Sequence, residues 1–120
     1  MVTKTRVEEL IDQFKAENKV MEIAVVGRSG TLIAGETPKG AHIETYAAMI
    51  AITFGAIETA ASETNEGVKA ISALLQSSNL IISQAGNNAI LIVRADGSTD
   101  YRELKDSLEK LSKSVGEVLS

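Results

Sequence analysis

The segment 79–95, Asn-Leu-Ile-Ile-Ser-Gln-Ala-Gly-Asn-Asn-Ala-Ile-Leu-Ile-Val-Arg-Ala, decides the fold class. Two strand-like runs, Leu80–Ala85 and Ala89–Ala95, are separated by Gly86-Asn87-Asn88, whose residue types favour a tight hairpin turn. The second run is apolar at consecutive positions, which is typical of a strand that is buried on both faces. Helices are therefore expected on both sides of the sheet that contains this strand.

Three further runs predict strands around this hairpin. Gly67–Gln76 precedes it and is connected through the turn residues Ser77-Ser78-Asn79. Nearer the amino end, Val20–Val26 and Thr31–Ala34 flank Gly27-Arg28-Ser29-Gly30, a pattern that favours a second hairpin. Because such short connections force neighbouring strands to run antiparallel, we expect one five-stranded antiparallel sheet.

Apolar residues recur at helical spacing in three other segments. The first is expected to begin near Thr5 and to close at Asn18-Lys19, the second covers Ile43–Thr64, and the third begins near Thr99 or Asp100. The first and the third both show capping-box spacing at these starts. The resulting order is α-β-β-α-β-β-β-α, which predicts an α+β domain.

Composition excludes several classes of function. A chain of 120 residues favours a single domain over residues 1–120. Sixteen acidic and twelve basic residues give a net charge of −4 without any basic cluster, so nucleic acid is not an expected partner. The absence of cysteine excludes disulfides, thiolate metal sites and cysteine nucleophiles.

The sequence also argues against insertion into a membrane. The longest apolar stretch, Tyr46–Ile57, is interrupted only by Thr53 and is well short of the ~20 residues that a spanning helix needs. The amino-terminal residues mix acidic and basic side chains, unlike a secretory signal. We therefore expect a cytoplasmic protein.

The Ile43–Thr64 helix is too apolar to have a single packing partner. On a helical wheel, one side carries the stripe expected to face the sheet: Ile43, Ile50, Phe54, Ile57 and Ala61. The opposite side carries Ala48, Met49, Ile52, Gly55 and Ala56, together with Thr45 and Thr59. The small residues on this second side favour close contact with another helix, and a second copy of the chain in a two-fold dimer is the expected partner. The alternative is that one of the other two helices packs there within the monomer.

No residue pattern predicts a catalytic, cofactor-binding or metal site. Gly35–Gly40 has the glycine spacing of a phosphate-binding loop, but Ala41-His42 stands where lysine and Ser/Thr are required. His42, the sole histidine, is expected to be a polar cap or an exposed residue, and no nucleophile motif accompanies it. We therefore expect no catalytic residue, no cofactor and no metal, and a protein that is not itself an enzyme.

Several segments together resemble a known family. They are the hairpin Val20–Ala34 with Leu-Ile-Ala after its turn glycine, the alanine-rich Tyr46–Thr64 leading into Val68–Gln76, the segment Asn79–Gly86, and Ala89–Val93. In this order they resemble the roadblock / dynein light-chain family in its compact prokaryotic form. The resemblance covers nearly the whole chain.

The resemblance implies a profilin-like α+β fold, with the Ile43–Thr64 helix on one face of the sheet and the other two helices on the opposite face. It also implies a homodimer formed through that helix and the strand that follows it, which joins two sheets into one. The corresponding positions in this chain are Ala48, Met49, Ile52, Gly55, Ala56, Val68, Ala70, Ser72 and Leu74.

Family members resemble one another in acting as platforms for Ras-like small GTPases. The resemblance therefore implies a non-catalytic homodimeric module that binds or regulates such a GTPase. Arg28 is the one residue that invites comparison with an arginine finger, but a solvated turn arginine is the favoured interpretation. The alternative function is a small-molecule sensor on a profilin- or PAS-like sheet, which needs an internal pocket that only four aromatic residues are available to line.

Overall fold

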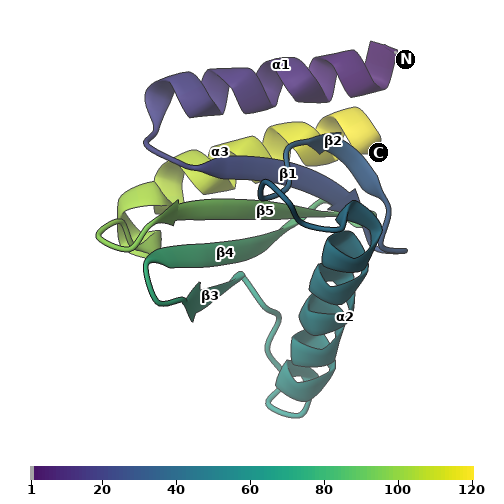
Figure 1. The fold of residues 1–120 in the computed structure, drawn as a ribbon. Coiled ribbons are helices and arrows are strands. Elements are labelled where there is room, and N and C mark those ends of the chain that lie inside the picture. The colour runs from purple at the N-terminus through teal and green to yellow at the C-terminus, as the bar shows by residue number, and fades with distance from the viewer. Residues whose placement is uncertain (1) are drawn as a thin grey trace.

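The computed structural model describes residues 2–120 and confirms the expected order of elements. Figure 1 shows the fold. The elements are α1 (Val2–Glu17), β1 (Glu22–Gly27), β2 (Leu32–Gly35), α2 (Ile43–Ser62), β3 (Ala70–Leu74), β4 (Ser78–Ala85), β5 (Ala89–Asp96) and α3 (Tyr101–Leu119).

The five strands form one antiparallel sheet in the order β2-β1-β5-β4-β3. The central strand, β5, is the one whose continuous apolar run predicted burial on both faces, and residues 89–93 are all buried. The two edges of the sheet are β2 and β3. The α+β architecture predicted from the sequence is therefore confirmed.

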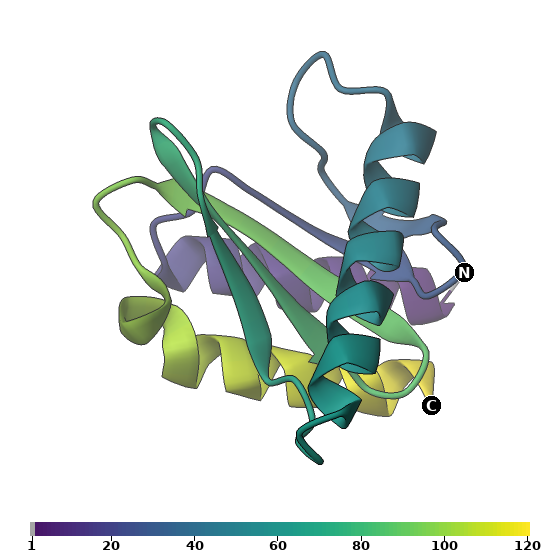
Figure 2. The ribbon, with the colours of Figure 1, turned by 90° about the horizontal axis from the view of Figure 1, so that it is seen from below.

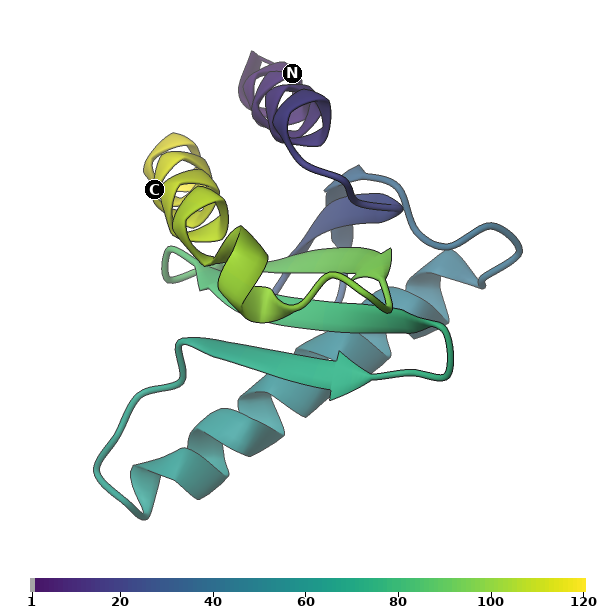
Figure 3. The same cartoon turned by 90° about the vertical axis from the view of Figure 1, so that its left-hand side faces the viewer.

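Helices cover the sheet unequally on its two faces (Figures 2 and 3). On one face α1 and α3 lie side by side over the larger core cluster, which includes Val7, Leu91 and Leu108. On the other face α2 packs alone over a smaller cluster that contains Phe54 and Ile90. This is the layer arrangement that the family resemblance implied.

Two helix starts show where local patterns succeed and fail. Asp100 caps α3 in a capping box with Glu103, as predicted from the spacing of these residues. By contrast, α1 begins at Val2 and not near Thr5, so the capping box expected at Thr5 is wrong. The preceding residues include no glycine or proline, and therefore nothing in them stops the helix from extending toward the amino end.

Pairing along the sheet corrects the expected ends of two strands. β3 covers Ala70–Leu74, a shorter run than the predicted Gly67–Gln76, because its ladder with β4 extends only over these five residues. Ser78 and Asn79, expected in a turn, belong to β4. Both pair with β5, and the Asn79 side-chain amide donates a 2.8 Å hydrogen bond to the carbonyl oxygen of Thr99.

Candidate interaction surface

Helix α2 crosses the sheet with only the middle of its length packed on it. Ala47, Ile50 and Phe54 are buried, whereas Ile43 and Ile57 remain 49% and 42% exposed. The predicted sheet-facing stripe is therefore correct in its middle and wrong at these two residues. A helix of 20 residues is about 30 Å long, and its carboxyl-terminal end extends past β3 in both Figure 1 and Figure 3.

The outward side of α2 is an exposed apolar strip. Ile52 is 61% exposed, and Met49 and Ala56 are exposed one turn before and after it. Between Glu44 and Glu63 the helix carries a single charged residue, Glu58. An uncharged apolar strip of this kind on a monomer is typical of a surface that contacts another protein.

Two of the predicted contact residues lie on a flank of α2. Ala48 faces the β1–β2 turn, because a Cβ placed on Gly30 would lie only 3.0 Å from the Ala48 Cα atom. Gly30 has a φ of +92°, so the turn itself favours glycine there. The small size of Ala48 thus has an explanation within the chain. Gly55 is half-buried, and a Cβ placed on it would meet open space.

Strand β3 leaves one of its edges open beside α2. Its residues alternate between the two faces of the sheet, and Ile71 lies opposite Ile82 of the α2-side cluster. Ile71 and Ala73 therefore share the α2 face. Sequence reasoning did not select these two residues, although their alternation with the positions it selected could have identified them.

The strand positions selected from the sequence lie on the opposite face. Ala70 pairs with Ser83, whose hydroxyl lies 3.3 Å from that of Ser112 on α3, so Ala70, Ser72 and Leu74 face the α3 side. Leu74 is 81% exposed there. The remaining selected residue, Val68, packs against the α2-side cluster. The fold thus groups Met49, Ile52 and Ala56 on one surface and divides the rest between flank, edge and opposite face.

The turn between β1 and β2 is tied to α2 by an ion pair. The Arg28 guanidinium donates hydrogen bonds of 2.6 and 2.9 Å to the two carboxylate oxygens of Glu58 and lies 5.5 Å from the centre of the Phe54 ring. The hydrogen bond to Glu58 raises the pKa of Arg28, and the same bond lowers the pKa of Glu58. The expectation of a solvated turn arginine is therefore wrong, because its partner is 30 residues away in the sequence.

A second arginine–glutamate pair lies on the α2 side of the sheet at the opposite ends of the strands. Arg94 of β5 donates hydrogen bonds of 2.6 Å from both Nε and a terminal nitrogen to Glu22 of β1. The hydrogen bond to Glu22 raises the pKa of Arg94, and burial is the main cause of a raised pKa at nearby Tyr46. This part of the sheet is only partly covered, since Leu80 opposite Arg94 is half-buried.

Most of the chain matches the model of a known protein family. The model of the Roadblock/LC7 domain matches residues 6–95. The chain belongs to the Roadblock/LC7 family. A search of curated proteins gives no significant match.

Solved structures extend the likeness of this Roadblock/LC7 chain to the whole fold. The gliding protein MglB from Thermus thermophilus superposes with a TM-score of 0.86 at 18% identity, over 98% of this chain and 91% of that one. A Roadblock/LC7 domain from Streptomyces avermitilis gives 0.82 at 19% identity, over 93% and 96%. Schizosaccharomyces pombe profilin gives 0.68 at 18% identity, over 92% and 97%, which confirms the profilin-like fold.

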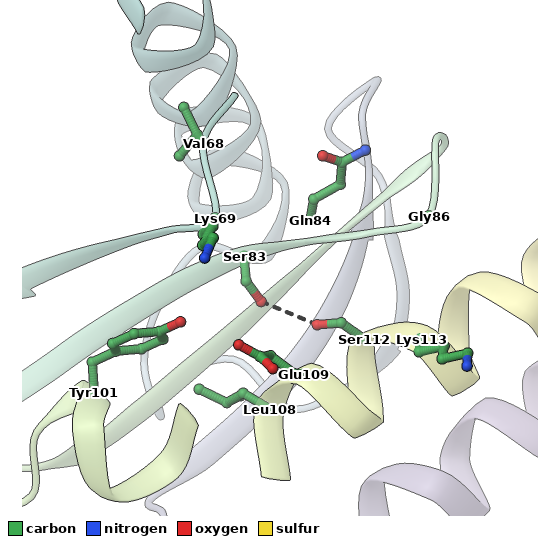
Figure 4. A pocket seen from close by; sticks show the side chains of 10 residues that line it. All are labelled: Val68, Lys69, Ser83, Gln84, Gly86, Tyr101, Leu108, Glu109, Ser112 and Lys113. Carbon is green, nitrogen blue, oxygen red and sulfur yellow. Dashed lines mark hydrogen bonds between the residues drawn. The ribbon is translucent and has the colours of Figure 1, made fainter. Parts of the chain in front are cut away.

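The α3 side of the Roadblock/LC7 sheet carries a cleft of about 540 Å³. Figure 4 shows Tyr101 and Glu109 of α3 across from Lys69 and Ser83, so the lining mixes polar and apolar side chains and comes from α3, β4 and the segment just before β3. Among residues 2–120, no three His, Asp or Glu side chains gather closely enough to hold a metal ion. The cleft thus offers hydrogen-bonding side chains from both of its sides.

His42 is the N-cap of α2, since its Nδ1 accepts a 3.3 Å hydrogen bond from the backbone N–H of Thr45. This confirms the polar cap expected from the sequence. In the part of the chain that the structure describes, no helix has the length and hydrophobicity needed to cross a membrane.

Proposed function

We propose that this Roadblock/LC7 chain is a non-catalytic homodimeric module that binds and regulates a Ras-like small GTPase. The observation that carries the proposal is the uncharged, exposed strip of α2 beside the open edge of β3. An uncovered edge strand invites pairing with another chain, and an exposed apolar helix face beside it enlarges the contact. Family membership supports the same function, because the resemblance implies platforms for small GTPases.

A two-fold axis through β3 places a second copy where it covers both features. Antiparallel pairing of β3 with its counterpart reverses the strand direction, so the partner's α2 crosses the sheet at the opposite ends of the strands. At these ends lie Ala73 and Leu80, which α2 of the same chain leaves half-buried. The end of α2 that extends past β3 then lies over the partner's sheet.

The dimer is tested by Gly55→Arg. A Cβ at this position meets open space within the chain, so the variant should fold as the wild type does. A long charged side chain beside the apolar strip should nevertheless prevent close contact between helices. Sedimentation velocity should show a dimer for the wild type and a monomer for the variant, with Gln13→Arg on α1 as a dimeric control. A Gly55→Arg variant that sediments as a dimer would place the interface elsewhere.

The GTPase partner is tested by capture from the native cell extract. The purified protein is immobilised and exposed to extract containing a non-hydrolysable GTP analogue, GDP or neither, and retained proteins are identified by mass spectrometry. A small GTPase enriched in one nucleotide state is the expected result. If no GTPase is retained in any nucleotide state, the proposal of a GTPase partner is wrong.

The second candidate function is a small-molecule sensor, and the cleft beside α3 is the observation that favours it. The lining of this cleft includes the hydroxyls of Ser83, Tyr101 and Ser112. A ligand that binds only the folded state raises the melting temperature by an amount that grows with the logarithm of its concentration above the dissociation constant. A thermal-shift screen of the chain without any protein partner distinguishes this function, since the module proposed above should give no shift.

A further inference from the structure

The β1–β2 turn lies along one flank of α2 and touches it at two places. Gly30 approaches Ala48, and Arg28 reaches Phe54 and Glu58. These contacts extend over eleven residues of the helix, from Ala48 to Glu58, or about 15 Å along its axis. The turn therefore supports α2 along half of its length.

The turn is itself held in a fixed place. The backbone N–H of Arg28 donates a 3.1 Å hydrogen bond to the carbonyl oxygen of Asn88 in the β4–β5 turn. Its neighbour Gly27 pairs with Ala89 in the ladder between β1 and β5. Since both connections lead to the central strand, Arg28 extends from a rigid part of the molecule.

Beyond Glu58, α2 has little contact with the sheet. Thr59, Ala60 and Ser62 are exposed. The hydroxyls of Thr59 and Ser62 bond to carbonyl oxygens of α2 itself. The Arg28–Glu58 pair thus lies at the boundary between the part of α2 that contacts the β1–β2 turn and the end that extends past β3.

We propose that Arg28 is a positioning residue that sets the direction of the carboxyl-terminal end of α2, and thereby the geometry of the dimer surface. The inference rests on the proposed homodimer and identifies what holds its contact helix in place. Two parallel hydrogen bonds to one carboxylate fix both the distance and the plane of the pair, and the Phe54 ring beneath the guanidinium fixes its tilt. A lysine at this position would keep the charge and lose this directional control.

This role also decides between two uses of the same arginine. An arginine finger must be free to enter the active site of another protein. Arg28 instead has both terminal nitrogens on Glu58. Loss of Arg28 should therefore act through the position of α2, and restoring the pair in reversed polarity should restore the function, which a finger would not permit.

The test compares Arg28→Glu, Glu58→Arg, their double reversal, Arg28→Lys and the neutral Glu58→Gln. The readouts are the dimer dissociation constant from sedimentation equilibrium and the rate of backbone hydrogen exchange over residues 59–66. Each single reversal should weaken the dimer about tenfold and speed this exchange, whereas the double reversal should recover most of both. Arg28→Lys and Glu58→Gln should fall between these limits.

The matched control is the Lys15–Glu36 pair, which joins α1 to the loop after β2 at 2.6 Å, away from the α2 strip. Lys15→Glu and Glu36→Lys should leave the dimer and the exchange rate unchanged. Single Arg28 and Glu58 variants that match the wild type in both readouts would overturn the proposal. If a reversal unfolds the chain, Glu58→Gln and Arg28→Lys still decide it. A monomeric wild type would refute the homodimer alone, and the exchange rates would then test the positioning role independently.

Discussion

Helices α2 and α3 show opposite relations between hydrophobicity and burial. α3 carries a narrow apolar stripe, and its Leu104, Leu108, Leu111 and Val115 are all buried against α1 and the sheet. α2 is far richer in apolar residues, yet the sheet buries only its middle. Because each helix can bury one face on a sheet, the excess apolar surface of α2 remains for another molecule. The apolar face of α3 is therefore covered within the chain, whereas part of the apolar surface of α2 is left exposed.

The largest effect is expected for Phe54→Ala, which removes the main anchor of α2. Phe54 is fully buried and also lies beneath Arg28, so its loss should cost about 4 kcal/mol of unfolding free energy. Urea denaturation measures the change, and Phe54→Leu should cost clearly less. A loss below about 1 kcal/mol would show that α2 does not depend on this anchor.

Leu108→Ala on α3 should cost slightly less, about 3 kcal/mol, because three other buried residues of the same stripe remain. The same denaturation experiment compares it directly with Phe54→Ala. Leu108→Met, which conserves volume, should cost less than about 1.5 kcal/mol. A larger loss for Leu108→Ala than for Phe54→Ala would reverse the contrast between a singly anchored helix and a broadly anchored one.

Ile52→Lys tests the open face of α2 and should separate association from stability. Ile52 is exposed, so the unfolding free energy should change by less than about 0.5 kcal/mol. The dissociation constant of the dimer should increase at least about tenfold, equivalent to about 1.4 kcal/mol of binding free energy, because a charge enters an apolar contact. Sedimentation equilibrium measures the dissociation constant, with Glu109→Lys at an exposed position of α3 as the control. An equally strong dimer would exclude this strip from the interface.

Asp100→Ala removes the capping box of α3 and should cost about 1 kcal/mol. Without the carboxylate, the backbone N–H groups of Arg102 and Glu103 can bond only to solvent at the start of the helix. Thermal unfolding measures the loss, and Asp100→Asn should retain most of the stability because asparagine also caps helices. If Asp100→Ala is neutral, the anchoring of α3 comes entirely from its apolar stripe.

The smallest effect is the pH dependence contributed by Glu58. Its pKa is lowered in the folded state by the hydrogen bond from Arg28, so the pair stabilises the fold above the ordinary carboxyl pKa of 4.5. This stability is lost as the pH falls through the lowered folded-state pKa. The contribution should stay below about 1 kcal/mol, since both side chains are about one-third exposed. The difference in stability between wild type and Glu58→Gln should therefore shrink from pH 7 to pH 3.

Sequence patterns predicted the fold to within a few residues at most element ends. The turn residues after Val26 and Ala85 located the β1–β2 and β4–β5 hairpins, and the unbroken apolar run of β5 located the centre of the sheet. The predicted contact surface was less complete. Met49, Ile52 and Ala56 share an exposed face, but helical periodicity alone could not show that the fold leaves Ile57 42% exposed.

Features that depend on the backbone's own periodicity could be predicted from the sequence: which segments are helices or strands, where they turn, and that α2 has more apolar surface than one partner can cover. The tertiary structure alone decided which residues meet across long separations. Gly30 against Ala48, Arg28 with Glu58, and the division of β3 side chains between two faces all depend on how α2 lies on the sheet. Local periodicity fixes the face on which a side chain lies, but a contact also requires the position of the opposing element, which only the packed chain supplies.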